Sequence, residues 1–360
     1  MAKIFQIGAG LVGRTMAIDL AKNHELHLAD FNYSLLQKIQ SKCPSIKIKQ
    51  LDATDKNQLQ AFIKQADIVL LAVPGFLGFH ALKCILEAGK DVVDISFSAE
   101  DFMALSSIAE SKGVTAIVDA GVAPGIPNYL LGYHDSLMKI ESFEYYVGGL
   151  PKYPKPPYNY KAPFSPIDVI EEYTRPARMM VNRVLVEKPA LSDIEIKAFK
   201  DVGNLEAFNT DGLRSILTTM PHIPNMKEKT LRFPGHANLM QSLHKSGKFD
   251  PDQIEDTSKS LLKEWELSPG ESEFTILDVI IKGENKSISY HLYDEYDKNN
   301  DMTSMSRSTG FTATASIELI LNGYFKDNGI FPPELVGKKE GCTKFILNYL
   351  KDRDLSIERS

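Results

Sequence analysis

The chain has 360 residues, of which 43% are hydrophobic and 24% are charged, and its formal net charge is −6. These values are typical of a globular protein with enough residues for two domains and a sizeable core. The modest negative charge is spread without long runs of one sign, so it gives no reason to expect nucleic acid or an anionic membrane as a partner.

Cysteine usage and the hydropathy of the segments exclude further classes of protein. The three cysteines, Cys43, Cys84 and Cys342, are scattered and odd in number, which favours a reducing compartment over a disulfide framework. No cysteine or histidine has the spacing of a metal site, so we expect no metal. The N-terminus lacks the pattern of a signal peptide, and no apolar run approaches the length of a membrane span. We therefore expect a cytoplasmic protein.

The stretch KIFQIGAGLVGRTMAIDL, from Lys3 to Leu20, contains G-x-G-x-x-G between a short apolar run and a helical pattern. In such a motif Gly8 makes the tight turn out of a strand, Gly10 lets the backbone approach a pyrophosphate, and Gly13 allows helix and strand to pack closely. The pyrophosphate would lie on the free N–H groups that open the helix. We expect cofactor contacts from Gly8, Ala9, Gly10, Leu11, Val12 and Gly13.

A second strand, ELHLAD from Glu25 to Asp30, ends in an acid 22 positions after Gly8. A carboxylate there accepts hydrogen bonds from the adenosine ribose and repels the 2′-phosphate of NADP. The next residues are Phe31 and Asn32, so no arginine follows that could hold a phosphate. The motif therefore favours NAD, and the alternative is an unliganded βαβ unit that keeps the pattern by chance.

Apolar runs alternate with helical patterns as far as Gly121, which indicates a buried parallel sheet covered by helices on both faces. We expect its further strands within residues 45–52, 66–74, 90–97 and 113–121. With right-handed crossovers this is a doubly wound, Rossmann-type dinucleotide-binding domain over residues 1–122. Ligands of such sheets bind at the carboxyl ends of the strands, so the residues to inspect are Asp52, Val73, Pro74, Asp94, Ser96 and Asp119.

The pattern changes at Ala123, where APGIPN leads into a helical run and then into the strand-like ESFEYYVGGL. The proline-rich stretch from Pro151 to Pro166 predicts a loop, either on the surface or lining a pocket. Beyond it we expect strands at 180–186, 205–209, 228–233, 273–282 and 286–294, the last two as an antiparallel hairpin, and helices at 236–246 and 258–264. We thus predict an α+β substrate domain with a mixed or antiparallel sheet over residues 123–308, and a helical segment over 309–360 that returns to the first domain.

Further landmarks follow one another along the chain. They are GAGLVG, Asp30, LDATD, VPGFLGFH, VDISF, DAGVAPG, YVGGLPKYPKPPYNYK, EEYTRPAR, TDGLRS, TLRFPGH and SMSRSTGFTA. Together they resemble the saccharopine dehydrogenase superfamily and, within it, the NAD-dependent lysine dehydrogenases that oxidise the side-chain amine of L-lysine. The chain departs from the saccharopine-forming reductases, which usually are longer and have an aspartate where this chain has Ala123. Both differences suit a smaller amino acid than saccharopine.

The resemblance implies an oxidoreductase that acts on a C–N bond. It implies cofactor contacts from the glycine loop, Asp30, Phe31, Asn32, Asp52, Ala53, Val73 and Pro74, and ligand contacts from the loop at Ser96 and Phe97. It further implies that Arg214 of TDGLRS, with Thr230 and Arg232 of TLRFPGH, holds the substrate.

Oxidation of an amine requires a neutral nitrogen, because an ammonium group has no lone pair to stabilise the developing iminium. The pKa of a free lysine amine is about 10.4, so the site must accept a proton or lower that pKa by desolvation. By position the proton acceptor is Asp119, Asp94 or His236, although each of these residue types also serves as a structural cap.

A substrate α-carboxylate fits the planar donors of arginine. Arg175, Arg178, Arg214 and Arg232 compete for that task, and Lys161 either relays a proton or is simply an exposed loop residue. The rival functions are saccharopine dehydrogenase, a carboxynorspermidine-type dehydrogenase, and a non-catalytic NAD-binding sensor. We expect a homodimer, because two-fold dimers are the commonest assemblies.

Overall fold

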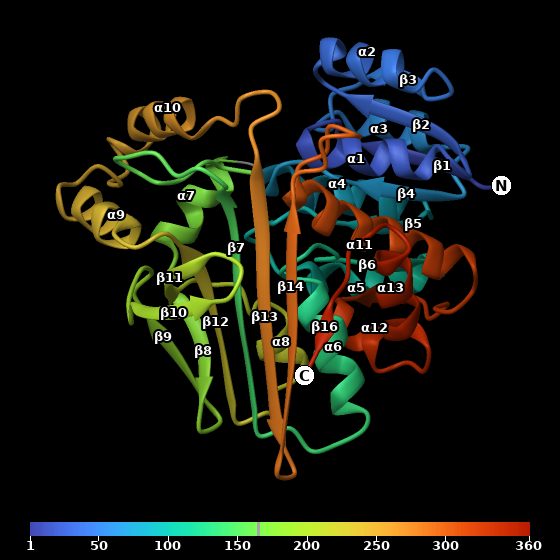
Figure 1. The fold of residues 1–360 in the computed structure, drawn as a ribbon. Helices are drawn as coiled ribbons and strands as arrows, with labels where there is room; N and C mark the ends of the chain where they lie inside the picture. The colour runs from blue at the N-terminus through green and yellow to red at the C-terminus, as the bar shows by residue number, and fades with distance from the viewer. Residues whose placement is uncertain (164–165) are drawn as a thin grey trace. The chain divides into compact units, whose positions relative to one another are not determined.

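The computed structural model describes residues 1–163 and 166–360, which form two compact units (Figure 1). Unit 1 comprises Met1–Ser136 and Ser306–Asp354, and unit 2 comprises Leu137–Met305 and Leu355–Ser360. Each unit has its own sheet, of seven strands in unit 1 and nine in unit 2. The predicted fold class, a Rossmann-type domain plus an α+β domain, is confirmed.

The sheet of unit 1 is parallel throughout, and its first six strands have the order 3-2-1-4-5-6 of a doubly wound nucleotide-binding fold. The strands are β1 (Lys3–Ile7), β2 (Glu25–Asp30), β3 (Lys47–Gln50), β4 (Ile68–Leu71), β5 (Asp91–Asp94), β6 (Thr115–Ile117) and β15 (Gly329–Phe331). The chain order reverses between β1 and β4, and ligands of such sheets bind beside that point. Residues of β4 are completely buried, as expected for a central strand with helices on both faces.

The helices of unit 1 come from both of its chain segments, the N-terminal one and the C-terminal one. They are α1 (Leu11–Leu20), α2 (Tyr33–Lys42), α3 (Lys56–Ile63), α4 (Gly75–Glu87), η1 (Phe102–Leu105), α5 (Ser106–Lys112), α6 (Ile126–Asp135), α11 (Ser304–Leu321, from Ser306 onwards), α12 (Pro333–Gly337) and α13 (Cys342–Lys351). Asn32 and Asp55 accept backbone N–H groups at the starts of α2 and α3, so these two helix ends are specified locally.

Helix α6 lies in unit 1, whereas the sequence placed all residues from Ala123 in the second domain. A Cβ atom on Gly132 would lie 2.0 Å from the carbonyl oxygen of Glu334, so α6 packs directly against α12. Asn128 of α6 also donates a hydrogen bond of 2.8 Å to the buried carboxylate of Glu334. These partners of α6 come from the far end of the chain, and they account for the place of α6 in unit 1.

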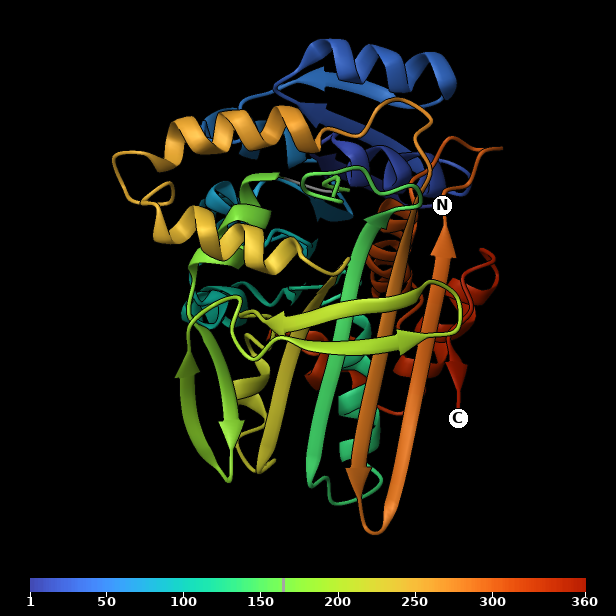
Figure 2. The same cartoon turned by 60° about the vertical axis from the view of Figure 1, so that its left-hand side comes forward.

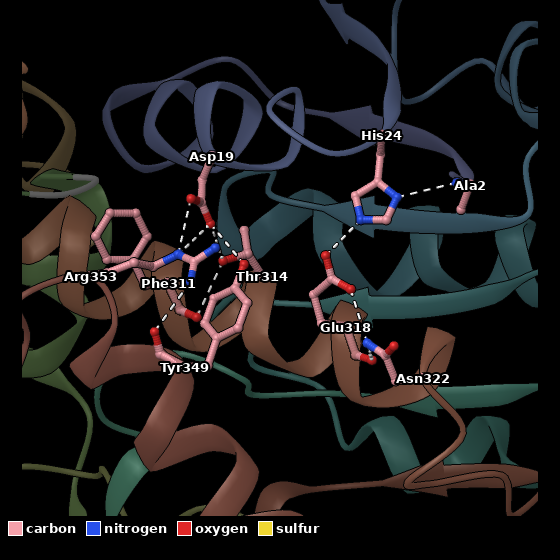
Figure 3. Close-up of polar contacts among 9 residues, drawn as sticks. All are labelled: Ala2, Asp19, His24, Phe311, Thr314, Glu318, Asn322, Tyr349 and Arg353. Atoms are coloured by element: carbon pink, nitrogen blue, oxygen red, sulfur yellow. Dashed lines mark hydrogen bonds and ion pairs between the residues drawn. The ribbon is translucent and has the colours of Figure 1, made fainter.

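The C-terminal helices bind α1, the helix that follows the glycine loop (Figure 3). Asp19 of α1 is buried and accepts hydrogen bonds from the side chains of Arg353 (2.9 Å), Thr314 (2.9 Å) and Tyr349 (2.8 Å). Nearby, Nε2 of His24 lies 2.6 Å from a carboxylate oxygen of Glu318 on α11. Buried polar contacts therefore hold α11 and α13 against the first βαβ unit.

The sheet of unit 2 is antiparallel except for one parallel pair, β7 with β12. Its strands are β7 (Ser142–Pro151), β8 (Ala177–Val181), β9 (Val184–Lys188), β10 (Glu195–Phe199), β11 (Gly203–Asn209), β12 (Asn225–Arg232), β13 (Glu273–Gly283), β14 (Lys286–Glu295) and β16 (Glu358–Arg359). Its helices are α7 (Pro166–Thr174), α8 (Ile216–Thr219), α9 (His236–Lys245) and α10 (Ile254–Trp265). The predicted hairpin of two long strands is confirmed as β13 and β14.

The predicted strand at 180–186 is wrong, because the chain reverses within it. β8 and β9 form a hairpin whose two turn residues, Asn182 and Arg183, both have positive φ, 49° and 67°. Two left-handed residues in succession make the tight turn that fits the twist of paired strands. The sequence analysis missed the turn because it contains no glycine.

A second hairpin, β10 with β11, crosses the face of β7, β13 and β14 (Figure 2). Its tip is held at β14, where His291 lies 3.0 Å from Asp201 of the tip and 2.6 Å from Asp278 of β13. Midway, the ammonium group of Lys197 lies 3.4 Å from the centroid of the Tyr146 ring. The crossing hairpin covers one face of the sheet.

In the part of the chain that the structure describes, no helix has the length and apolar character needed to cross a membrane.

Replacing Asp19 by alanine should lower the free energy of unfolding by about 3 kcal/mol, because Arg353 would lose its buried counter-ion. Chemical denaturation measures this change. Lys22→Ala is the control, since Lys22 is exposed and 3.5 Å from the same carboxylate, and it should change the free energy by less than about 0.5 kcal/mol. Equal effects of the two substitutions would contradict a structural role for the buried network.

Candidate cofactor and substrate sites

The glycine loop of unit 1 has no room for side chains at two of its three glycines. Gly8 has a φ of +105°, and a Cβ atom there would lie 2.1 Å from the carbonyl oxygen of Ala72. A Cβ atom on Gly13 would lie 2.3 Å from the carbonyl oxygen of Gly8. Around Gly10, in contrast, a Cβ atom would have nothing within 4 Å, and no side chain caps α1. The loop thus presents open space beside bare helix N–H groups, and this arrangement fits a dinucleotide pyrophosphate.

The carboxylate of Asp30 ties the end of β2 to the glycine loop. Its two oxygens accept backbone N–H groups of Ala9 and Asn32, each at 2.7 Å. A carboxylate oxygen has a second lone pair, so these bonds leave acceptor capacity for ribose hydroxyls. The Asn32 side chain caps α2, whereas Phe31 is 73% exposed at the same strand end. Of the three predicted cofactor residues Asp30, Phe31 and Asn32, the side chain of Asn32 is thus already engaged in capping α2.

The other predicted cofactor residues follow β3 and β4 at the carboxyl edge of the sheet. The backbone N–H and the hydroxyl of Thr54 donate hydrogen bonds to the Asp52 carboxylate and hold its pKa below its usual range. The Asp52 side chain therefore stabilises the turn that follows β3. Ala53 packs against the core, and Val73 precedes Pro74, the residue at which α4 starts. The structure therefore brings these residues to the sheet edge where ligands of such folds bind.

Ser96 lies at the same edge but is buried. Its hydroxyl donates to Asp94 at 2.9 Å, and its oxygen would be 2.0 Å from a Cβ atom on Gly78, so it packs beneath α4. Phe97 beside it is half-buried. Asp119 follows β6, is buried, and has a positive φ of 56°. Asp94 is thus already engaged by Ser96, and Asp119 lies beyond the end of the neighbouring strand.

In unit 2 the predicted motifs meet around Arg232, which is 2% exposed. Its Nε donates to the Tyr173 hydroxyl and its Nη1 to the Leu231 carbonyl oxygen, both at 2.9 Å. Its Nη2 lies 3.2 Å from Glu172, and the guanidinium carbon lies 4.3 Å from the centroid of the Tyr160 ring. The protein therefore surrounds Arg232 with acceptors and aromatic rings, and its contact with a substrate stays a prediction.

His236 belongs to the same cluster and is buried at the start of α9. Its Nδ1 lies 2.8 Å from the carbonyl oxygen of Tyr158, and because a carbonyl oxygen can only accept, Nδ1 must carry the hydrogen. The other nitrogen, Nε2, therefore accepts a hydrogen bond from the Tyr173 hydroxyl, whose oxygen lies 3.0 Å from it. Burial, with a smaller contribution from Arg232, lowers the pKa of His236 to about 3. A neutral imidazole with both nitrogens engaged opposes the prediction that His236 accepts a proton.

Thr230 lies in a second buried group, with Thr210 and Glu228. The hydroxyl oxygen of Thr210 lies 2.8 Å from that of Thr230 and 2.7 Å from a carboxyl oxygen of Glu228, which also accepts the Gly212 N–H. Burial raises the pKa of Glu228 to about 8, although the hydrogen bond from Thr210 opposes the shift. A neutral Glu228 therefore supports the loop that carries Arg214, which has a positive φ of 47°.

Two other arginine candidates are ion-paired. Arg178 binds Asp211 with two parallel hydrogen bonds of 2.9 and 2.8 Å, and Arg175 pairs with Glu171 one turn earlier on α7. The ammonium group of Lys161 donates to the carbonyl oxygens of Glu264 and Glu266, so it caps the end of α10. The proline-rich stretch that contains Lys161 is partly outside the described residues, at 164–165, but its Tyr160 is buried against Trp265.

The sequence analysis named neither Glu172 nor Glu228 as a site residue. Glu172 has a 20% exposed side chain, and burial raises its pKa to about 7 against the opposing effect of Arg232. The signal for Glu172 was its place in EEYTRPAR, and the signal for Glu228 was an acid within a predicted strand. Within residues 1–163 and 166–360, no group of three or more His, Cys, Asp or Glu side chains has the arrangement of a metal site.

Two sequence families match this chain in succession. Residues 4–117 match the family described as the saccharopine dehydrogenase NADP binding domain, and residues 121–355 match its C-terminal domain. The chain belongs to the saccharopine dehydrogenase family. The resemblance drawn from the motifs is therefore confirmed at the level of the family.

The relatives within this family are distant. Alpha-aminoadipic semialdehyde synthase of Arabidopsis thaliana is 27% identical over 239 residues, which cover 60% of this chain and 22% of that protein. The NADP-dependent, L-glutamate-forming saccharopine dehydrogenase of Schizosaccharomyces pombe is 26% identical over 196 residues, 52% of this chain and 44% of that one. The chain thus spans less than half the length of either curated relative.

Apo saccharopine dehydrogenase (L-Glu forming) from Saccharomyces cerevisiae has a similar structure, with a TM-score of 0.81 at 17% identity. The similarity covers 100% of this chain and 99% of that one. At this identity it establishes a shared fold.

Replacing Glu228 by glutamine should flatten the pH dependence of stability. Because the pKa of Glu228 is raised from 4.5 to about 8 on folding, its contribution is complete below pH 4.5 and is lost as the pH rises through 8. The unfolding free energy of the variant should therefore fall less steeply over this range, by up to about 1.4 kcal/mol per pH unit.

Thermal unfolding followed across this pH range measures the difference. Glu187→Gln, at an exposed acid of β9, is the control and should leave the pH dependence unchanged. An unchanged slope in Glu228→Gln would mean that the pKa of Glu228 is not raised in the folded protein.

Proposed function

We propose that this protein oxidises the side-chain amine of L-lysine with NAD, giving an imine that water converts to ammonia and a semialdehyde able to cyclise. The dinucleotide supplies the hydride acceptor. The observation that carries the choice of substrate is the charge balance of unit 2. Arg175, Arg178 and Arg232 already pair with the carboxylates of Glu171, Asp211 and Glu172.

The pairing of these arginines with protein acids limits the negative charge that a substrate can carry. Saccharopine has three carboxylates and lysine has one, so saccharopine requires more cationic groups that are not committed to protein acids. A site in which arginines are matched by acids suits a substrate with a net positive charge. Ala123, at the position where saccharopine-forming reductases usually have an aspartate, is consistent with this choice.

The choice of NAD rests on the end of β2. A carboxylate at Asp30, beside the loop, repels a 2′-phosphate, and neither Phe31 nor Asn32 offers a cation to bind one. The matching family is described by its NADP binding domain, so NADP is the alternative that must be tested.

The proton acceptor is the next part of the proposal. Of the three predicted candidates, His236 is neutral and hydrogen-bonded at both nitrogens, and Asp94 already accepts the Ser96 hydroxyl, so we favour Asp119. Glu172 is a further candidate, because a carboxylate whose pKa is about 7 is matched to proton transfer near neutral pH.

Saccharopine oxidation is the second candidate function, and the names of the relatives favour it, since the Schizosaccharomyces pombe protein acts on saccharopine. A sensor that binds NAD without turnover is the alternative from another class. One spectrophotometric screen separates these functions: lysine, saccharopine, ornithine and carboxynorspermidine, each with NAD and with NADP. Reduced-nicotinamide absorbance that develops only with saccharopine would overturn the lysine assignment, and absorbance with none would favour the sensor.

The double substitution Asp30→Ala with Phe31→Arg should move cofactor preference toward NADP by at least tenfold in kcat/KM, because it removes the repelling charge and adds a phosphate ligand. Asp30→Asn is the control, since its amide oxygen keeps an acceptor for one of the two backbone N–H groups. An unchanged ratio of NAD to NADP efficiencies in the double variant would remove Asp30 from the ribose site.

Arg232→Ala should raise the KM for the amino acid by at least tenfold while changing the KM for NAD little, because the two ligands use different parts of the chain. Tyr173→Phe is the matched control, since it removes one hydrogen-bond partner of Arg232 and keeps the guanidinium group. Steady-state kinetics measure both constants. A larger effect of Arg232→Ala on the NAD constant would place this arginine outside the substrate site.

A further inference from the structure

Gln6 is a polar residue at an apolar position. It lies in the central strand β1 between Phe5 and Ile7, its partners on the neighbouring strands are Leu28 and Leu70, and it is 0% exposed. A primary amide buried among aliphatic side chains is unfavourable unless it is hydrogen-bonded.

The amide nitrogen of Gln6 bridges the two ends of the glycine loop. It donates to the carbonyl oxygen of Gly8 at 2.8 Å and to that of Gly13 at 2.7 Å. These acceptors fix the orientation of the amide, because the reversed orientation would place Oε1 against two carbonyl oxygens. In the described part of the chain Oε1 has no partner, so the interactions of this side chain are the two that bind the loop.

The bridge determines which loop groups face a ligand. The Gly8 and Gly13 carbonyls turn toward Gln6, and the Ala9 N–H is held by Asp30. The N–H groups of Leu11, Val12 and Gly13 have no hydrogen-bond acceptor within residues 1–163 and 166–360. A loop fixed at both ends keeps these three donors oriented before the anion arrives, which reduces the ordering cost of binding.

We propose that Gln6 is a positioning residue for the cofactor, which holds the free N–H groups of the glycine loop in place for the pyrophosphate of a pyridine dinucleotide. This inference rests on the proposed dinucleotide-dependent function. It assigns Gln6 no contact with the cofactor itself.

The test replaces Gln6 by methionine, which has a similar length and no donor. The dissociation constant of NADH, followed by nucleotide fluorescence, should rise on the order of tenfold, because two hydrogen bonds to the loop are lost. The KM for NAD should rise with kcat unchanged. The midpoint of thermal unfolding should stay close to that of the wild type, because the substitution also removes a buried acceptor without a partner.

Gln60→Met is the matched control. Gln60 of α3 donates one hydrogen bond of 3.1 Å to the carbonyl oxygen of Cys84 on α4 and not to the glycine loop, so its loss should leave the NADH dissociation constant unchanged. Gln6→Glu is the second variant. A carboxyl group that stays protonated in this apolar site donates one hydrogen, so its dissociation constant should lie between those of the wild type and Gln6→Met.

The outcomes are distinct. Weaker NADH binding in the Gln6 variants, with normal unfolding and a normal Gln60→Met, supports the proposal. Wild-type affinity in Gln6→Met, or in Gln6→Glu if Gln6→Met does not fold, overturns it. Wild-type protein that binds neither NADH nor NADPH overturns the proposed function instead, since the binding measurement requires no amino-acid substrate.

Discussion

The close approach of three backbone segments around Gly8 is the constraint on which unit 1 depends. A side chain on Gly8 would meet the Ala72 carbonyl oxygen after β4, and a side chain on Gly13 of α1 would meet the Gly8 carbonyl oxygen. The chain therefore passes close to β4 and α1 as it leaves β1, the strand next to which the strand order reverses. The open space at Gly10 and the bare N–H groups follow from this packing.

The C-terminal helices reinforce the same element from its other side. Asp19 lies in the last turns of α1, and its buried carboxylate accepts side-chain hydrogen bonds from three residues that lie more than 290 positions later in the chain. A charge buried in this way has a large desolvation cost, so the network ties the position of α1 to the complete assembly of unit 1. The glycine loop and Asp30 specify the cofactor end of α1, and the C-terminal segment fixes its opposite end.

The strands and helices that form the candidate cofactor site were predictable because the information for them is local. The strand, the three glycines and the acid at the end of β2 all lie within the first 30 residues, and each acts on its immediate neighbours. The candidate substrate site was less predictable, because its three motifs, TDGLRS, TLRFPGH and EEYTRPAR, lie far apart in the sequence. The pairing of β11 with β12 and the packing of α7 bring them together. Strand β15, the β8–β9 turn and the partners of α6 were missed for the same reason, since long-range contacts or a turn without glycine define them.

The two buried clusters of unit 2 respond to burial in opposite ways. Arg232 is surrounded by Glu172 and two tyrosines, whereas burial raises the pKa of Glu228, whose carboxyl group accepts hydrogen bonds from Thr210 and the Gly212 N–H. The acids of unit 2 thus offset the cost of desolvation in two ways, by pairing with arginine at Glu171, Asp211 and Glu172, and by a raised pKa at Glu228.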